Sequence, residues 1–215
     1  ARGKLAAVTP APGGSEAEIR YIPFEQQYPH LDLAAAPAET EAQTALVRAY
    51  LAAFGPATEA DISFWTGFGK SETARAISGL SPETTPALVE GIPGMLLALK
   101  NQADALGAVA LPAAPVVCLL PANDPYITAH RASRSRYFSN QTWQRQVYDS
   151  RGTAKPTILI NGQVAGVWRW APEDSAEPLV WTLLAEVNRS LAARIEAELV
   201  RLEQFISSDL ARLQL

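Results

Sequence analysis

Residues Thr44–Leu80 read TALVRAYLAAFGPATEADISFWTGFGKSETARAISGL, in which two breaks that contain glycine separate three helical patterns. The apolar residues of the first pattern are Leu46, Val47, Tyr50, Leu51 and Phe54. Their spacing of three and four residues recurs on one side of a helix. Gly55-Pro56 follows at once, and this pair predicts that the first helix ends there.

A second helix is predicted from a capping sequence. Thr58 and Asp61 have the spacing of a Ser/Thr-x-x-Asp/Glu cap, in which the hydroxyl group accepts a hydrogen bond from a free amide at the start of a helix. Ile62 and Trp65 would face inward from this helix. Residues 66–69 are expected to form the turn that follows it.

The third helix is expected to begin at Ser71. Its buried face is predicted to contain Ala74, Ile77 and Leu80, and its exposed face Glu72, Thr73, Arg75 and Ser78. Residues 87–90 and 95–99 flank a Gly-Ile-Pro-Gly turn, which favours a β-hairpin. Three helices and a hairpin are the elements of a winged helix-turn-helix, whose third helix enters a DNA groove. The alternative is a three-helix packing unit without nucleic acid, because such units also bind proteins.

Positive charge is concentrated in one part of the chain. The protein has 215 residues and a net charge of -4, which argues against non-specific DNA binding by its whole surface. Residues 127–170, however, contain seven Lys and Arg against one acidic residue, a net charge of +6. Arginine can hold phosphate with two N–H groups, and the aromatic residues between these arginines can stack on bases. The composition therefore favours a nucleic-acid surface over a solvated basic loop.

The remaining chain predicts a small β-rich unit. The apolar run at residues 116–120 is expected to be a strand that is buried on both faces. Residues 156–170 predict the clearest hairpin, because Asn161-Gly162 readily adopts the positive φ angles of a type I′ turn. A third strand is expected at residues 179–184, and an amphipathic helix at residues 188–210 would cover the sheet.

These patterns together predict an α+β fold, with a winged helix-turn-helix followed by a small β-rich unit and a C-terminal helix. Residues 1–39 are expected to be a connector with one short strand at most, or alternatively the end of a truncated preceding domain. A winged helix-turn-helix domain is predicted at residues 40–110. Residues 111–215 would form a domain that contains the β-hairpin, the basic segment and the terminal helix.

The sequence predicts neither a metal site nor a cofactor. His30 and His130 lie far apart and have no neighbouring residues at metal-ligand spacing. The single cysteine, Cys118, lies in an apolar run, which is typical of a buried core residue. One cysteine, no segment apolar enough to cross a membrane and no secretion signal predict a cytoplasmic protein without a membrane partner. The sequence does not indicate an oligomeric state.

Three blocks of sequence together resemble a known family. They are LVRAYLAAFGPATEADISFWTG at 46–67, LLPANDPYITAHR at 119–131 and PTILINGQVAGVWRW at 156–170. In this order, and followed by a terminal helix, they are similar to the winged-helix DNA-binding proteins related to the AlkZ-type (YcaQ-like) bacterial DNA glycosylases. The resemblance is to the C-terminal portion of these proteins.

The resemblance implies winged-helix modules and a β-rich unit arranged around a DNA channel. Some members of the family excise alkylated bases or release crosslinked nucleotides without a metal, using two glutamines that flank an apolar residue. That motif belongs to an earlier region of the family, and Gln144-Arg145-Gln146 does not match it because the middle residue is charged. We therefore expect no catalytic residue and no complete active site in these residues.

The leading hypothesis is a DNA-binding winged-helix module of an AlkZ-like protein that holds double-stranded DNA. The candidate DNA-binding residues are Lys70, Arg75, His130, Arg131, Arg134, Arg136, Arg151, Lys155, Trp168 and Arg169. Because the third helix exposes an acidic residue beside its cations, most DNA contact is expected at the basic segment and at the exposed end of the 157–170 hairpin. The alternatives are part of a metal-independent DNA glycosylase, with its catalytic glutamines in a preceding region, and a winged helix that binds a protein.

Overall fold

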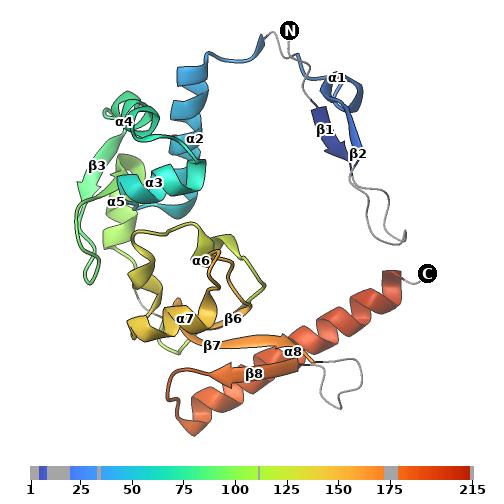
Figure 1. Cartoon of the computed structure of the whole chain (residues 1–215). Helices are drawn as coiled ribbons and strands as arrows, with labels where there is room; N and C mark the ends of the chain where they lie inside the picture. The colour runs from blue at the N-terminus through green and yellow to red at the C-terminus, as the bar shows by residue number, and fades with distance from the viewer. Residues whose placement is uncertain (1–4, 9–19, 33–34, 111, 172–178, 214–215) are drawn as a thin grey trace. The chain divides into compact units, whose positions relative to one another are not determined.

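The chain forms two compact units, residues 1–42 and residues 43–215, in the computed structural model of Figure 1. The structure describes residues 5–8, 20–32, 35–110, 112–171 and 179–213. Helices and strands occur in both units. This mixture confirms the α+β class that the sequence predicts.

The first unit contains a hairpin of two strands. Strands β1 (Leu5–Val8) and β2 (Arg20–Pro23) pair antiparallel, with Ala6 opposite Ile22. Helix α1 (Phe24–Gln27) follows β2 directly. The composition of this region, rich in Ala, Pro and Gly, predicted one strand at most, and the structure pairs that strand with a second one.

Three helices pack around one apolar core at the start of the second unit. They are α2 (Glu39–Phe54), α3 (Glu59–Thr66) and α4 (Lys70–Gly79). The predicted cap of α3 is confirmed. The Thr58 hydroxyl accepts the backbone N–H of Asp61 at 3.1 Å, and the Asp61 carboxylate accepts the backbone N–H of Thr58 at 3.3 Å. Gly67, with a φ of 73°, ends the helix in the left-handed conformation that favours glycine.

The buried face of α4 agrees with the prediction at Ile77 and Leu80, which belong to the core or pack against it. It differs in the first turns of the helix, where Thr73 and Ala76 are buried and Ala74 is exposed. A threonine can occupy the core here because its hydroxyl donates a hydrogen bond to the Gly69 carbonyl at 3.0 Å. Trp65 of α3, predicted to face inward, packs its ring against that of Tyr50, with 5.1 Å between the ring centres, while 40% of the residue remains exposed.

A short hairpin follows the three helices. Strand β3 (Thr84–Ala87) pairs antiparallel with β4 (Leu96–Leu99), and helix α5 (Lys100–Gly107) comes directly afterwards. The second strand agrees with the prediction, and the first lies earlier in the chain. Ala57, in the loop after α2, bridges to Leu97 of β4 and ties the hairpin to the helices. The order of elements is the one predicted for a winged helix-turn-helix. We use the name three-helix unit for this part of the second unit, which consists of α2, α3, α4, β3 and β4.

A four-stranded antiparallel sheet forms the centre of the remaining part of the second unit. Its strands are β5 (Val117–Leu120), β6 (Thr157–Ile160), β7 (Gln163–Trp170) and β8 (Leu179–Leu183), in the order β5-β6-β7-β8. The predicted hairpin is confirmed, because Asn161 and Gly162 have φ angles of 50° and 81° between β6 and β7. The Asn161 side chain also accepts the backbone N–H of Val116 at 2.9 Å.

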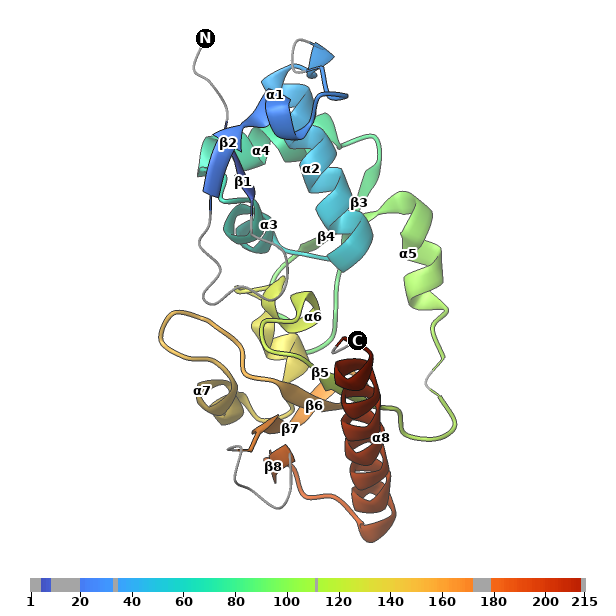
Figure 2. The same cartoon turned by 90° about the vertical axis from the view of Figure 1, so that its right-hand side faces the viewer.

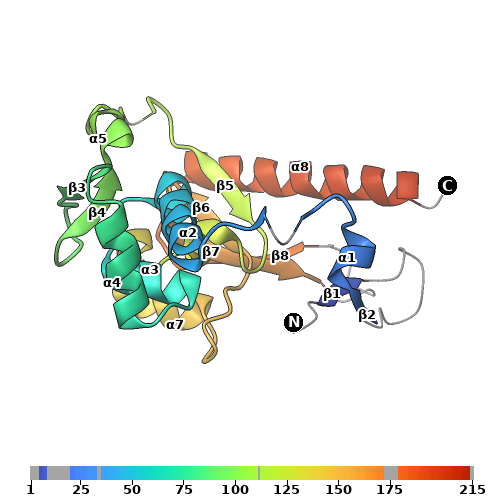
Figure 3. The ribbon, with the colours of Figure 1, turned by 90° about the horizontal axis from the view of Figure 1, so that it is seen from above.

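Each face of the sheet is covered by a different part of the chain (Figure 1). Helix α8 (Arg189–Leu213) packs its buried Ile195 and Leu199 against one face, beside Ile158 and Trp168. Figures 2 and 3 show α8 as a single straight helix that runs alongside the sheet. The amphipathic helix predicted at residues 188–210 is therefore confirmed.

The other face is covered by residues 121–156, which we call the connecting segment. It contains the short helices α6 (Pro125–Thr128) and α7 (Gln144–Val147) and 3-10 turns at Arg134–Tyr137 and Gln141–Trp143. Its apolar residues Ile127, Phe138 and Val147 pack against Leu159 and Val164 of the sheet. Most of the basic segment, residues 127–170, thus lies in the connecting segment, a folded layer that has its own apolar core.

Cys118 and its strand correct the prediction of a strand buried on both faces. Strand β5 lies at an edge of the sheet, and the Cys118 side chain is exposed. The other residues of β5 are only partly buried. An apolar run does not reveal whether its strand is central or at an edge, because that depends on which segment pairs with it.

Candidate nucleic-acid interface

A buried carboxylate joins the three-helix unit to the connecting segment. Asp61 of α3 has no exposed surface. Its Oδ1 atom accepts the backbone N–H groups of Arg131, Ala132 and Ser133 at 2.8, 2.7 and 3.2 Å. Its Oδ2 atom accepts the hydroxyl groups of Ser133 and Thr58. Residues 131–133 of the basic segment are thereby held against helix α3.

These hydrogen bonds keep the Asp61 carboxylate ionised. Burial acts to raise the pKa of Asp61, because it removes water from the charged form. The hydrogen bonds from Ser133, Thr58 and Arg131 outweigh that effect and lower the pKa from 3.8 to about 2. The carboxylate is therefore charged at neutral pH and serves as a fixed acceptor inside the protein.

His130 is a buried structural residue, which corrects its prediction as a DNA contact. Only 3% of its side chain is exposed. Its Nε2 atom lies 3.0 Å from the Phe54 carbonyl oxygen, and its Nδ1 atom bonds to the Tyr137 hydroxyl. Since a carbonyl only accepts, Nε2 carries the hydrogen and the Tyr137 hydroxyl donates to Nδ1 in the neutral ring. Burial and the nearby Arg136 charge lower the pKa of His130 to about 4, so the ring is neutral at pH 7.

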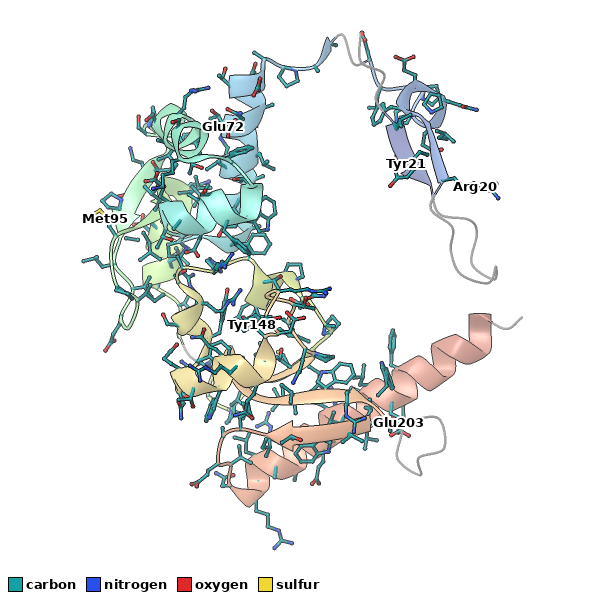
Figure 4. All side chains as sticks on the ribbon, in the orientation of Figure 1. Arg20, Tyr21, Glu72, Met95, Tyr148 and Glu203 are labelled. Atoms are coloured by element: carbon teal, nitrogen blue, oxygen red, sulfur yellow. The ribbon has the colours of Figure 1, made fainter. Side chains whose placement is uncertain are left out.

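Arg136 and Arg134 are half-buried and are largely used within the protein. The Arg136 guanidinium donates to the Pro56 carbonyl at 3.0 Å and to the Ser133 hydroxyl at 2.9 Å. The Arg134 guanidinium lies 3.8 Å from the centre of the Tyr148 ring, a cation–π contact. Figure 4 labels Tyr148 in the connecting segment, among the side chains above the sheet. These two arginines are therefore less available to phosphate than their charge suggests.

Lys70 and Arg131 lie at one exposed hollow beside α3. The hollow has a volume of about 560 Å³ and is lined by Glu59, Ala60, Ser63, Phe64, Lys70 and Arg131. The guanidinium of Arg131 lies 5.3 Å from the centre of the Phe64 ring. The Phe64 side chain is 42% exposed. Two cations from distant parts of the sequence are thus combined with an accessible aromatic ring, and we use the name hollow for this group of six residues.

Three other predicted cations are exposed at separate places. Arg75 lies on α4, and Arg151 and Lys155 lie on the connecting segment near its end. The loop that carries Arg151 is tightly turned, because the Asp149 carboxylate accepts the backbone N–H groups of Arg151 and Thr153 at 2.9 and 2.8 Å. The pKa of Asp149 is lowered by these bonds, of which that from Thr153 has the largest effect.

The two predicted contacts on strand β7 lie in opposite environments. Trp168 was expected on an exposed end of the hairpin, but it is buried between the sheet and α8 with 7% of its side chain exposed. Its indole N–H donates to the Leu120 carbonyl at 3.0 Å, which satisfies its polar atom inside the protein. Arg169 and its neighbour Trp170 are exposed. Because side chains alternate along a strand, Trp168 and Arg169 face opposite sides of the sheet.

A family model described as "DNA glycosylase AlkZ-like" matches residues 1–205. This chain belongs to the AlkZ-like DNA glycosylase family. The membership confirms the resemblance seen in the three sequence blocks and connects the AlkZ-like chain with DNA repair.

A solved structure has the same fold as this AlkZ-like chain. It is the Streptomyces sahachiroi DNA glycosylase AlkZ, with a TM-score of 0.72 and 24% sequence identity. The match covers 93% of this chain and 52% of that one, so the AlkZ-like chain spans about half the length of the solved protein. A comparison with curated proteins found no match.

The described residues of the AlkZ-like chain contain neither a membrane-crossing helix nor a metal cluster. No helix among them is both long and apolar enough to cross a membrane. No group of three or more His, Cys, Asp or Glu side chains in the described part of the chain is placed to hold a metal ion.

Two residues of this site in the AlkZ-like chain were missed by sequence reasoning. Asp61 was recognised only as part of a helix cap, although the same carboxylate also holds residues 131–133. No function was predicted for Phe64, because it lies between Ile62 and Trp65, two residues that were predicted to face the core. The signal that points to it is the helical spacing: Asp61 and Ile62 are both buried, so Phe64 falls on a different side of α3.

Proposed function

We propose that this chain is a DNA-binding winged-helix module that holds double-stranded DNA. The observation that carries the proposal is the position of Lys70 and Arg131 at one exposed hollow, in a member of a DNA glycosylase family. Each of these cations comes from a different motif. The Asp61 carboxylate holds the backbone at Arg131 against α3, and Lys70 begins the next helix, α4. A pair of accessible cations at one hollow is suited to binding phosphate groups of a DNA backbone.

The proposed DNA surface contains the exposed cations and not the buried candidates. Its members are Lys70, Arg75, Arg131, Arg151, Lys155 and Arg169. Arg134 has a smaller role, since its guanidinium already contacts Tyr148. Arg136 is a positioning residue, because its guanidinium bridges the Pro56 carbonyl and the Ser133 hydroxyl. Because His130 and Trp168 are buried, they support the surface from within.

The salt dependence of DNA binding tests this proposal. The variant Lys70→Ala/Arg131→Ala is compared with the unchanged chain by fluorescence anisotropy on a labelled duplex at several salt concentrations. Each lost phosphate contact lowers the slope of log K against log salt by about 0.9, so we expect a decrease of about 1.8.

A control variant shows whether the change in slope comes from the loss of a phosphate contact or from the loss of any positive charge. Arg194→Ala removes an exposed arginine from α8, at a distance along the chain from the proposed surface, and should leave the slope unchanged. If Lys70→Ala/Arg131→Ala and Arg194→Ala gave the same slope as the unchanged chain, the proposed surface would be wrong.

A second candidate function is base excision from damaged DNA. It is favoured by the description of the matching family model and by the solved AlkZ, which is itself a DNA glycosylase. Residues 1–215 contain no Gln-apolar-Gln sequence, so this function would use catalytic glutamines outside them. The test is base release from alkylated DNA, measured as abasic sites. Release by this chain alone would contradict a purely DNA-holding role and would place catalytic groups within these residues.

A further inference from the structure

The hollow beside α3 has features that phosphate binding alone does not require. Its volume of about 560 Å³ lies within the range of about 300–1,000 Å³ that is typical of small-ligand sites. Phe64 and Ala60 give it apolar surface, and Lys70 and Arg131 give it positive charge. A phosphate group gains nothing from an exposed aromatic ring, so the combination indicates a ligand with both an anionic and a flat apolar part.

Phe64 and Arg131 provide a surface for stacking. The Arg131 guanidinium is 5.3 Å from the centre of the Phe64 ring, within the range of a cation–π contact. Nucleobases stack both on aromatic rings and on guanidinium planes. The backbone at Arg131 is fixed, because its N–H donates to Asp61 Oδ1 at 2.8 Å. The two platforms are therefore anchored to the same helix, α3, before any ligand arrives.

The charges of the hollow fit one nucleotide. Lys70 at the start of α4 and Arg131 supply two cations for a phosphate diester. Glu59 supplies one carboxylate, which can accept a hydrogen bond from an exocyclic amino group of a base. Bases inside a paired duplex are already stacked on each other and cannot reach Phe64, so the nucleotide must be unpaired.

We infer that this hollow binds a single unpaired, undamaged nucleotide of DNA, with its base against Phe64 and its phosphate between Lys70 and Arg131. The inference rests on the proposed function and adds a preference for DNA in which one nucleotide lies outside the duplex. Because stacking on a ring is tolerant of base identity, the site is selective for DNA structure and not for sequence.

The test compares two undamaged DNA molecules at one salt concentration. One is a fully paired duplex, and the other is the same duplex with one additional unpaired cytosine, whose exocyclic amino group can donate to Glu59. Affinity is measured by fluorescence anisotropy for the unchanged chain, Phe64→Leu, Phe64→Tyr and Arg194→Ala. From the usual strength of base–aromatic stacking, we expect the unchanged chain to bind the DNA with the unpaired nucleotide about 5- to 150-fold more tightly.

Each variant has its own expected result. Phe64→Leu should remove the preference and retain affinity for the paired duplex, whereas Phe64→Tyr keeps an aromatic ring and should keep the preference. Arg194→Ala should behave as the unchanged chain. Ala60→Leu keeps the Phe64 ring and adds a larger side chain to the hollow one helical turn away from it. It should also remove the preference, which provides a second variant should Phe64→Leu disturb folding. Circular dichroism of each variant verifies the fold.

The possible failures are distinguishable. If the unchanged chain binds both DNA molecules equally, the inference is overturned and the proposed function stands. If it binds neither, the proposed function fails, and the inference fails with it. If Phe64→Leu and Ala60→Leu both keep the preference, the unpaired nucleotide binds elsewhere and the hollow is not its site.

Discussion

Replacing Asp61 by asparagine should destabilise the protein and loosen its basic segment. The substitution retains the shape of the side chain and one oxygen, which can still accept the three backbone N–H groups from residues 131–133. The new amide nitrogen takes the place of Oδ2, where the Thr58 N–H and the hydroxyl groups of Ser133 and Thr58 now donate. The Ser133 hydroxyl cannot readily reverse its role, because its oxygen already accepts a hydrogen bond from Arg136.

The expected loss of stability follows from the pKa of Asp61. Its pKa of about 2, against 3.8 for an unperturbed group, means that the folded protein favours the charged carboxylate over the neutral form. At 1.36 kcal/mol for each pKa unit, the difference is about 2.5 kcal/mol. The contact between the amide nitrogen and the Thr58 N–H adds to this cost. We expect Asp61→Asn to lower the free energy of unfolding by about 2 to 4 kcal/mol at pH 7.

The sharper test is how the difference in the free energy of unfolding between the unchanged chain and Asp61→Asn varies with pH. A lowered folded-state pKa contributes stability that is present above pH 4 and is lost as the pH falls toward 2, because the unfolded state binds the proton first. Asparagine has no such dependence. The two proteins should therefore differ most at pH 7 and converge as the pH falls from 4 to 2. Urea unfolding followed by circular dichroism, at pH 7, 4 and 3, measures the difference.

The control for Asp61→Asn is Asp104→Asn, which changes an exposed aspartate on α5. A surface substitution of this kind should alter the free energy of unfolding by no more than about 0.5 kcal/mol. The reasoning is refuted if Asp61→Asn is as mild as the control at pH 7, or if its effect is the same at pH 3 as at pH 7.

Three further predictions concern buried and surface residues. Burial lowers the pKa of His130 to about 4, so the unfolded state takes up the proton first as the pH falls. The free energy of unfolding of the unchanged chain, measured with urea, should therefore fall by about 2 to 3 kcal/mol between pH 6.5 and 4. His130→Gln has no group that titrates at this position and should lose less stability over the same range. Trp168→Phe should cost about 1 to 3 kcal/mol, through the lost hydrogen bond to Leu120, while the salt slope of DNA binding stays unchanged; a lower slope would indicate direct DNA contact. Glu59→Gln should tighten binding to paired duplex DNA about twofold in anisotropy measurements, because it removes a negative charge from the hollow; weaker binding would contradict a phosphate in this position.

Local features of this fold could be predicted from the sequence because neighbouring residues create them. The Thr58–Asp61 cap and the Asn161-Gly162 turn both depend on residues that are close along the chain, and the structure has both. The terminal helix predicted at residues 188–210, which the structure has at 189–213, could be recognised because its apolar residues recur with a helical period. Interactions of this range are fully specified by a short window of sequence.

The orientation of side chains was less predictable. Thr73 lies in the core where Ala74 was expected, because the position of α4 depends on how α2 and α3 pack against it. Cys118 is exposed because its strand lies at a sheet edge, and Trp168 is buried because α8 covers its face of the sheet. Each of these outcomes depends on a partner segment that is distant in the sequence.

The stretch Thr44–Leu80 by itself determined the three helices, their breaks and the cap that begins α3. Only the tertiary structure decided that Asp61 of that stretch would also hold the backbone of residues 131–133, and so bring Arg131 to the hollow that Phe64 and Lys70 line. The physical reason is that a buried carboxylate must find donors for all its lone pairs. The sequence indicates that Asp61 needs such donors, but only the folded chain shows which distant N–H groups supply them.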